Sequence, residues 1–114
     1  MNTQKLYKLI FNVPLSHADQ VRKAIGDAGA GQVGNYSHCS FSVRGKGRFI
    51  PNEKANPHVG KAGQYEEVEE EQVQVDVMQN KIQDVIDALL KAHPYEEVGF
   101  EIYEQLDWKK IVKL

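Results

Sequence analysis

The residues best suited to chemistry in this sequence lie in the string HPYEE at residues 93–97. Imidazole nitrogen and carboxylate oxygen are suitable ligands for a divalent metal ion, so His93, Glu96 and Glu97 are candidate metal ligands. Pro94 disfavours a helical conformation for the residue before it, so the same string is also typical of a turn that ends a helix. In that alternative, the His and Glu side chains hydrogen-bond backbone groups and hold no ion.

A second candidate region is the stretch of residues 45–64, which is rich in glycine and contains two prolines. The pattern predicts a loop of about twenty residues, and loops of that length in compact domains are usually functional or mobile. We name His58, Arg48 and Tyr95 as candidate ligand-binding residues. The entrance of the loop is basic and suited to an anionic ligand because of Arg44, Lys46 and Arg48, although a solvated loop without a ligand is the alternative.

Composition and charge exclude several other classes of function. The 114 residues include 14 Lys and Arg, 16 Asp and Glu and a single cysteine. A net charge of −2 with no basic run argues against a nucleic-acid binder, and one cysteine excludes an intrachain disulfide framework. There is no apolar stretch of membrane-spanning length and no signal-peptide pattern, so we expect a cytoplasmic protein without a membrane partner. A Ser-His-Asp set, a phosphate-binding loop and a dinucleotide glycine fingerprint are also missing.

Hydrophobic periodicity predicts the elements that position the candidate residues. Apolar or alternating stretches predict strands at residues 5–13, 36–44, 66–78 and 98–104, and stripes at helical spacing predict helices at 16–29 and 81–92. In the third strand, Val68 has the opposite parity to Val73 and Val75. Either a β-bulge near residues 69–71 corrects the register, or the acidic half of this strand projects beyond the sheet.

This order of elements predicts an α+β fold, the ferredoxin-like βαββαβ sandwich, with four antiparallel strands and two helices on one face. In that topology, the turn at 93–97 lies at the same edge of the sheet as the 45–64 loop, within one chain or across a subunit boundary. The predicted core consists of the apolar residues on the helix-facing sides, namely Leu9, Phe11, Val21, Ile25, Phe41, Val43, Val75, Val77, Ile82, Val85, Ile86, Leu89, Phe100 and Ile102.

The other face of the sheet predicts self-association. Two helices cover only one face, yet Leu6 and Ile10 lie opposite the main core face of the first strand. Exposed apolar patches of this kind mark interaction surfaces, so we expect a homo-oligomer that associates through open sheet faces and strand edges. The alternative is that the C-terminal segment folds back over this face with its apolar residues Trp108, Ile111, Val112 and Leu114.

Several strings also resemble a known family in their order along the chain. Residues 34–41 (GNYSHCSF), 45–51 (GKGRFIP), 56–57 (NP), the acidic run at 66–71 and 93–97 (HPYEE) are similar to the domain inserted in the YqfO-like branch of the Nif-three-like (GTP cyclohydrolase I type 2-like) dimetal proteins. That insert resembles the PII and CutA proteins, which are ferredoxin-like trimers. The resemblance covers about residues 4–106 and implies one stand-alone domain at 1–114, with a C-terminal segment at 107–114.

The resemblance also implies what this chain lacks. The dimetal proteins bind their metals in the flanking halves, through residues absent here, so no hydrolase or cyclohydrolase activity is inherited. We therefore expect a non-catalytic, oligomeric binding or regulatory module, with a trimer favoured, that engages a small ligand, a metal ion or a partner protein through the 45–64 loop and the 93–97 turn. The alternative is a metal-dependent hydrolase-like activity. A divalent metal ion is the only cofactor that the candidate residues suggest.

Overall fold

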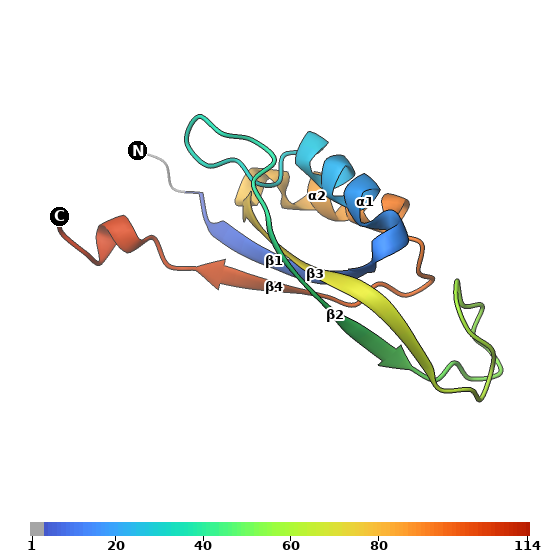
Figure 1. Ribbon diagram of the computed structural model, residues 1–114. Helices are drawn as coiled ribbons and strands as arrows, with labels where there is room; N and C mark the ends of the chain where they lie inside the picture. Colours follow the sequence, from blue (N-terminus) through green and yellow to red (C-terminus); the bar gives the residue numbers. More distant parts are fainter. Residues whose placement is uncertain (1–3) are drawn as a thin grey trace.

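The computed structural model describes residues 4–114 and has the predicted ferredoxin-like architecture (Figure 1). The sheet has the order β2-β3-β1-β4, and all neighbouring strands are antiparallel. The two α-helices lie side by side on one face of this sheet. In chain order, the elements are β1 (Leu6–Pro14), α1 (Leu15–Asp27), β2 (Phe41–Phe49), β3 (Glu66–Met78), the 3-10 turn η1 (Gln79–Lys81), α2 (Ile82–Ala92), β4 (Phe100–Gln105) and the 3-10 turn η2 (Trp108–Lys110).

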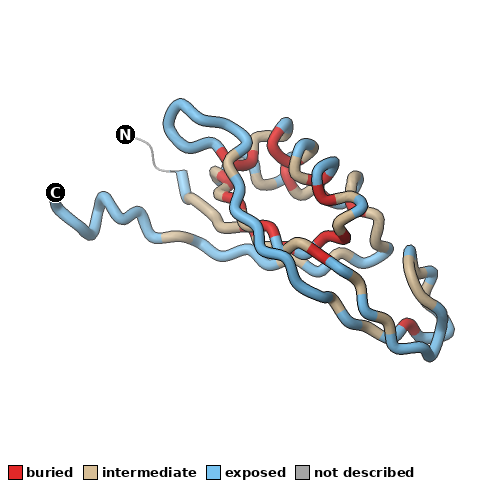
Figure 2. Tube along the Cα trace, viewed as in Figure 1, coloured by how far each residue is buried: buried red, intermediate tan, exposed pale blue. Residues whose placement is uncertain are grey.

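The core lies between the helices and the central strands (Figure 2). On β1 and β3, the odd-numbered residues point to the helices, and Leu9 is paired in register with Val75. Eight predicted core residues are buried, namely Leu9, Phe11, Val21, Ile25, Val75, Val77, Val85 and Leu89, while Ile82, Ile86 and Phe100 are partly buried against them. The core also includes Val13, Ala18, Ala30 and Val73, which the sequence analysis did not select.

Three predicted core residues are exposed, and the strand register explains each of them. Phe41 and Val43 are paired with Gln74 and Gln72, which lie on the face of the sheet that no helix covers. Their exposed fractions are 64% and 47%. Ile102 is paired with Leu9 and so shares the helix-facing side, but it lies on the edge strand β4, where 41% of it remains exposed.

The second strand starts later than predicted, because residues 31–40 form a separate excursion after α1. α1 ends as expected at glycine, since Gly29 and Gly31 have φ angles of 118° and 79°, which favour residues without a Cβ. Val33 and Tyr36 then exchange two backbone hydrogen bonds in a tight turn. The strand β2 extends to Phe49 instead, so the loop before β3 covers only residues 50–65.

The long strand β3 contains no bulge; its acidic half projects beyond the sheet. The register of β2 with β3 is continuous from Phe41↔Gln74 to Phe49↔Glu66. The register of β1 with β3 stops at Pro14↔Glu70, so the outer part of the β2–β3 hairpin is a two-stranded ribbon. Figure 1 shows this ribbon extending away from the body, with the 50–65 loop at its end. The ribbon at one end and the C-terminal segment at the other give the molecule its length, 53 Å against 24 and 22 Å in the other directions.

The C-terminal segment does not cover the open face of the sheet. After Gln105, the chain continues past the end of β4 and away from the body (Figure 1). Trp108, Ile111 and Val112 are exposed, and Asp107 accepts a hydrogen bond from the backbone N–H of Lys109 at the start of η2. None of the helices in the described residues 4–114 is long and apolar enough to cross a membrane.

Candidate functional site

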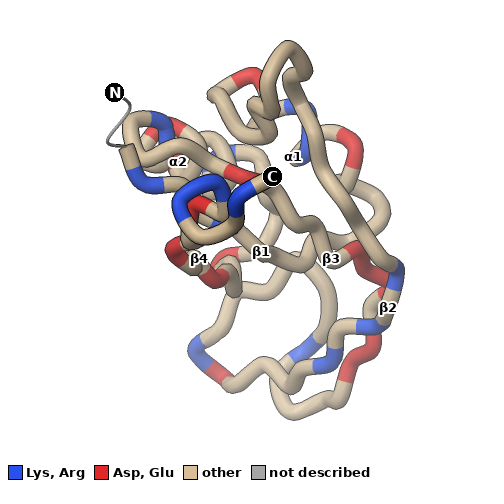
Figure 3. Tube along the Cα trace, turned by 90° about the vertical axis from the view of Figure 1, so that its left-hand side faces the viewer, with Lys and Arg blue, Asp and Glu red and all other residues tan. Residues whose placement is uncertain are grey.

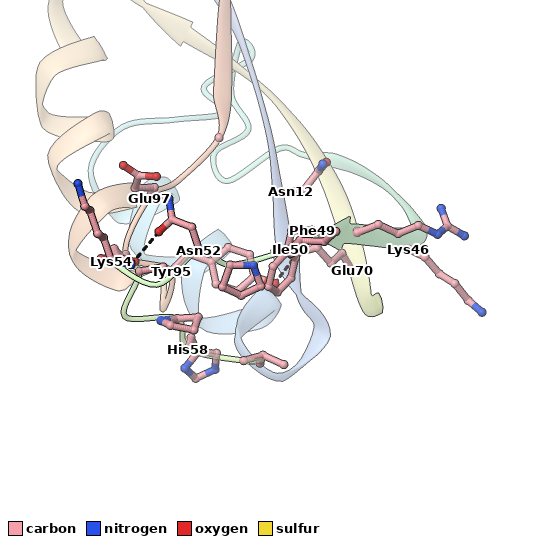
Figure 4. A pocket seen from close by; sticks show the side chains of 18 residues that line it. Asn12, Lys46, Phe49, Ile50, Asn52, Lys54, His58, Glu70, Tyr95 and Glu97 are labelled. Atoms are coloured by element: carbon pink, nitrogen blue, oxygen red, sulfur yellow. Dashed lines mark hydrogen bonds between the residues drawn. The ribbon is translucent and has the colours of Figure 1, made fainter. Parts of the chain in front are cut away.

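The projecting hairpin, its loop and the turn after α2 enclose a cleft of about 870 Å³ (Figure 4). β1 and β3 contribute its inner end, β2 one wall and the 50–65 loop the rim. The lining comprises Asn12, Lys46, Gly47, Arg48, Phe49, Ile50, Pro51, Asn52, Lys54, Ala55, Pro57, His58, Val59, Glu70, Tyr95, Glu96, Glu97 and Gly99. Five of the six candidate residues therefore meet in one place, and His93 lies behind them.

His93 is fixed by two hydrogen bonds at the end of α2. Its ring is 5% exposed; Nε2 lies 2.8 Å from the carbonyl oxygen of Asn12, and Nδ1 accepts from the N–H of Tyr95 at 3.1 Å. An Nδ1 that accepts must carry a lone pair, so the proton is on Nε2 and the ring is neutral. Burial lowers the pKa of His93 below its ordinary value of 6.5, in agreement with a neutral ring. Both ring nitrogens are thus occupied, and the geometry gives His93 a structural role.

Half-buried Tyr95 and buried Glu70 form a hydrogen-bonded pair at the inner end of the cleft. The Tyr95 hydroxyl donates to Oε2 of Glu70 at 2.7 Å, and Glu70 is only 7% exposed. Burial, followed by the contact with Glu70, raises the pKa of Tyr95 well above its usual value, so the phenol stays protonated. A side chain at Gly47 would collide with the Glu70 carboxylate, so the carboxylate would have to move away from its present position.

The 50–65 loop is tied back to the turn after α2. A carboxylate oxygen of Glu96 accepts a hydrogen bond from the backbone N–H of Asn56 at 2.9 Å. The ring centroids of His58 and Tyr95 are 6.3 Å apart. The meeting of the two candidate regions at one edge of the sheet, which the topology predicted, is therefore present within one chain.

One of the three cationic side chains that line the cleft is in an ion pair. Arg48 donates to Glu67 at 2.8 Å across the hairpin, an arrangement that raises the pKa of Arg48 and lowers that of Glu67. Figure 3 shows the basic residues of β2 beside the acidic residues of β3 along this ribbon. Within residues 4–114, the ammonium groups of Lys46 and Lys54 form no ion pair, although Lys46 also contributes to the lowered pKa of Glu67. These two residues are the other cations that line the cleft.

The candidate metal ligands do not form a closed coordination set. Glu96 is engaged with the loop backbone, and both nitrogens of His93 are hydrogen-bonded. Among the residues that the structure describes, no group of three or more His, Cys, Asp and Glu side chains is arranged to hold a metal ion. The alternative interpretation of residues 93–97, a helix-ending turn held by hydrogen bonds, describes His93 and Glu96 in this structure.

The sequence analysis missed His17, which lies in the first turn of α1. Its ring and that of His58 are in edge-to-face contact, with centroids 5.3 Å apart and planes at 89°. Because Pro14 ends β1 at the same edge of the sheet, α1 starts beside the 50–65 loop. The position of His17 directly after the first strand was the available signal, since that junction was already expected at the candidate edge.

Antiparallel strands in the order β2-β3-β1-β4, with both helices on one face, define the ferredoxin-like class to which the CutA proteins belong. The structure is similar to that of CutA1 from the psychrotrophic bacterium Shewanella sp. SIB1, with a TM-score of 0.65 over 90% of this chain and 82% of that one, at 12% identity. No family model matches the chain.

The sequence identifies a narrower group of similar proteins than the fold does. The chain is similar to one segment of the proteins named GTP cyclohydrolase 1 type 2 homolog. It is 48% identical to the Halalkalibacterium halodurans protein of that name over 101 residues, which are 89% of this chain and 27% of the relative. The structure of a Bacillus cereus protein related to NIF3 matches with a TM-score of 0.80 and 42% identity, over 94% of this chain and 27% of that one. The resemblance to YqfO-like, Nif-three-like proteins is therefore confirmed, and the chain spans about a quarter of their length.

Proposed function

We propose that this chain is a non-catalytic, homo-oligomeric binding or regulatory module, a single PII/CutA-like domain whose cleft takes a small ligand or a segment of a partner protein. The observation that carries the proposal is the preformed cleft between the β2–β3 hairpin and residues 93–97. Binding sites are typically concave, largely apolar and supplied with a few polar groups. Phe49 and Tyr95 supply the apolar surface here, and Lys46 and Lys54 supply unpaired cations.

The relatives support a binding role more than a catalytic one. The similarity to the GTP cyclohydrolase 1 type 2 homologs extends over about a quarter of their length, so their whole-chain activity is not assigned to this segment. Within the described residues, the buried acids and imidazoles are held by hydrogen bonds: Glu70 by Tyr95, and His93 by backbone groups. Such fixed groups shape a pocket, and they offer neither a free nucleophile nor a free base.

Self-association is the second part of the proposal, and the open face of the sheet supports it. Phe41, Val43 and Tyr103 lie on this face with exposed fractions of 64%, 47% and 54%. Burying such a surface against a second copy removes apolar area from water, which is favourable by about 25 cal/mol per Å². A trimer is the assembly that the CutA-like fold favours.

Amide NMR spectroscopy with a library of small polar fragments tests the binding role. With EDTA present to remove metal ions, we expect fragments that bind to shift the amide signals of residues 46–60 and 95–99. Lys54→Ala should weaken the binding of these fragments, whereas Lys109→Ala, in the distant C-terminal segment, should leave their affinity unchanged. Shifts that cluster outside the cleft, or the absence of any binding fragment, would contradict the proposal.

A further inference from the structure

Tyr95 is in ring contact with two of the four histidines in the chain, and a third contacts one of these two, although all three come from distant parts of the sequence. His93 lies 4.9 Å from Tyr95 between ring centroids, His58 lies 6.3 Å from it, and His17 contacts His58 at 5.3 Å. His17 belongs to α1, His58 to the 50–65 loop and His93 to the end of α2. The cluster therefore joins three separate elements at the rim of the cleft.

The nitrogens of His17 and His58 differ from those of His93 in their availability. Nδ1 of His17 lies 2.8 Å from the hydroxyl oxygen of Ser16, and no other partner of this ring's nitrogens is present among residues 4–114. When Nδ1–H donates to Ser16, the lone pair of His17 is on Nε2. Metal-binding histidines are typically oriented by such a bond from the opposite nitrogen. Within the described chain, neither ring nitrogen of His58 has a hydrogen-bond partner.

The separation of the two rings also suits a shared metal ion. A metal–nitrogen bond of about 2.0 Å places the ion about 3.2 Å from a ring centroid, and two tetrahedral ligands then have centroids about 5.2 Å apart. The observed separation of His17 and His58 is 5.3 Å. The centroid distance therefore suits a shared ion, and a turn of one ring about its Cβ–Cγ bond would be needed to direct both nitrogens to it.

We propose that His17 and His58 bind a first-row transition-metal dication, such as Zn²⁺ or Cu²⁺, at the rim of the cleft. Imidazole pairs favour these ions over Mg²⁺ and Ca²⁺, which prefer oxygen ligands. No third His, Cys, Asp or Glu of the described residues completes the set, so water or a ligand in the cleft fills the remaining positions. This proposal rests on the proposed binding function of the cleft. It adds the class of ion that would bind there, and it assigns the metal-ligating role to residues other than His93, Glu96 and Glu97.

Isothermal titration of the tag-free protein with Zn²⁺ and with Cu²⁺ at pH 7.5 tests this site. We expect one ion per protomer, and at least about tenfold weaker binding for His17→Gln and for His58→Gln, since each removes one of two protein ligands. His38→Gln is the matched control because His38 is an exposed histidine that bonds Asp27 near the other end of α1, and it should leave the affinity within about twofold. An unchanged affinity in either of the first two variants, or an equal loss in the control, overturns the proposal.

A measurement on the unaltered protein keeps the test independent of how the variants fold. On addition of Zn²⁺, the imidazole C–H signals of His17 and His58 should shift, while those of His38 and His93 should not. If the addition of Zn²⁺ shifts the imidazole signals of other histidines only, the proposal that His17 and His58 bind the ion is refuted. The fragment experiment in EDTA is unaffected by that result, so failure of the metal site and failure of the cleft are distinguishable.

Discussion

Replacing His93 by Gln tests the structural role of the buried imidazole. Glutamine can preserve one of the two hydrogen bonds, either to the Asn12 carbonyl or to the N–H of Tyr95, and it leaves the other group buried without a partner. An unsatisfied buried group costs about 1–3 kcal/mol, and the ring contact with Tyr95 is lost as well. We expect the free energy of unfolding to fall by about 2–3 kcal/mol, with the oligomer retained.

His93→Gln should change the pH dependence of stability as well as the free energy of unfolding itself. Burial lowers the pKa of His93 in the folded protein below the ordinary 6.5 of the unfolded chain. Between these two pKa values, the unfolded state binds more protons, so stability rises with pH. The contribution of His93 is therefore complete above pH 6.5 and decreases as the pH falls from there toward the lower folded-state pKa. His93→Gln should remove this part of the pH dependence.

Urea denaturation at a series of pH values between 5 and 8 measures both effects. The protomer concentration is kept constant, because the apparent stability of an oligomer depends on it. His38→Gln serves as a control, since His38 is exposed and its replacement should change stability by less than about 0.5 kcal/mol. If His93→Gln is as stable as the original protein, or keeps the same slope between pH 5 and 6.5, the hydrogen-bonded neutral imidazole is not what holds this turn.

Three further predictions concern the core, the cleft and the assembly. Leu89→Ala should lower the free energy of unfolding by about 2–5 kcal/mol, because Leu89 is fully buried; a loss below about 0.5 kcal/mol in urea would show that the site is not packed. Tyr95→Phe leaves the Glu70 carboxylate without its donor and should cost about 1–3 kcal/mol in the same assay, whereas the exposed Tyr103→Phe should cost little. Phe41→Glu places a charge on the open sheet face and should reduce the mass seen by light scattering to that of one 12.9 kDa chain, so an unchanged larger mass would exclude this face as the interface.

The fold could be predicted because its elements follow clear periodic patterns. Periodicity alone, however, does not show which face of the sheet the apolar residues of a strand occupy. The alternation of Phe41 and Val43 correctly indicates a strand, and only the pairing with β3 shows that both lie on the open face. Ile102 was assigned to the correct side, yet its edge position leaves it partly exposed. Burial depends on neighbours that a single strand's sequence does not specify.

The candidate site was predictable where topology alone determines it. The order of elements places residues 93–97 beside the loop after β2, and the hydrogen bond between Glu96 and Asn56 realises this proximity. The role of each side chain was not predictable, because the two hydrogen bonds of His93 depend on where the Asn12 carbonyl and the Tyr95 N–H lie. His17 was missed because it belongs to no distinctive string, and its meeting with His58 exists only in three dimensions.

The cross-strand pairing of Leu6 with Gln105 makes this fold suitable for insertion into a larger protein. These residues begin β1 and end β4, and they are direct cross-strand partners. A host chain could enter and leave through two adjacent points without stretching either connection, the condition under which domain insertion is best tolerated. The 50–65 loop, whose residues line the cleft, lies at the far end of the molecule from the start of β1 and the end of β4 (Figure 1), so the host would not obstruct the cleft. The same arrangement suits relatives in which the matching segment is only 27% of the polypeptide.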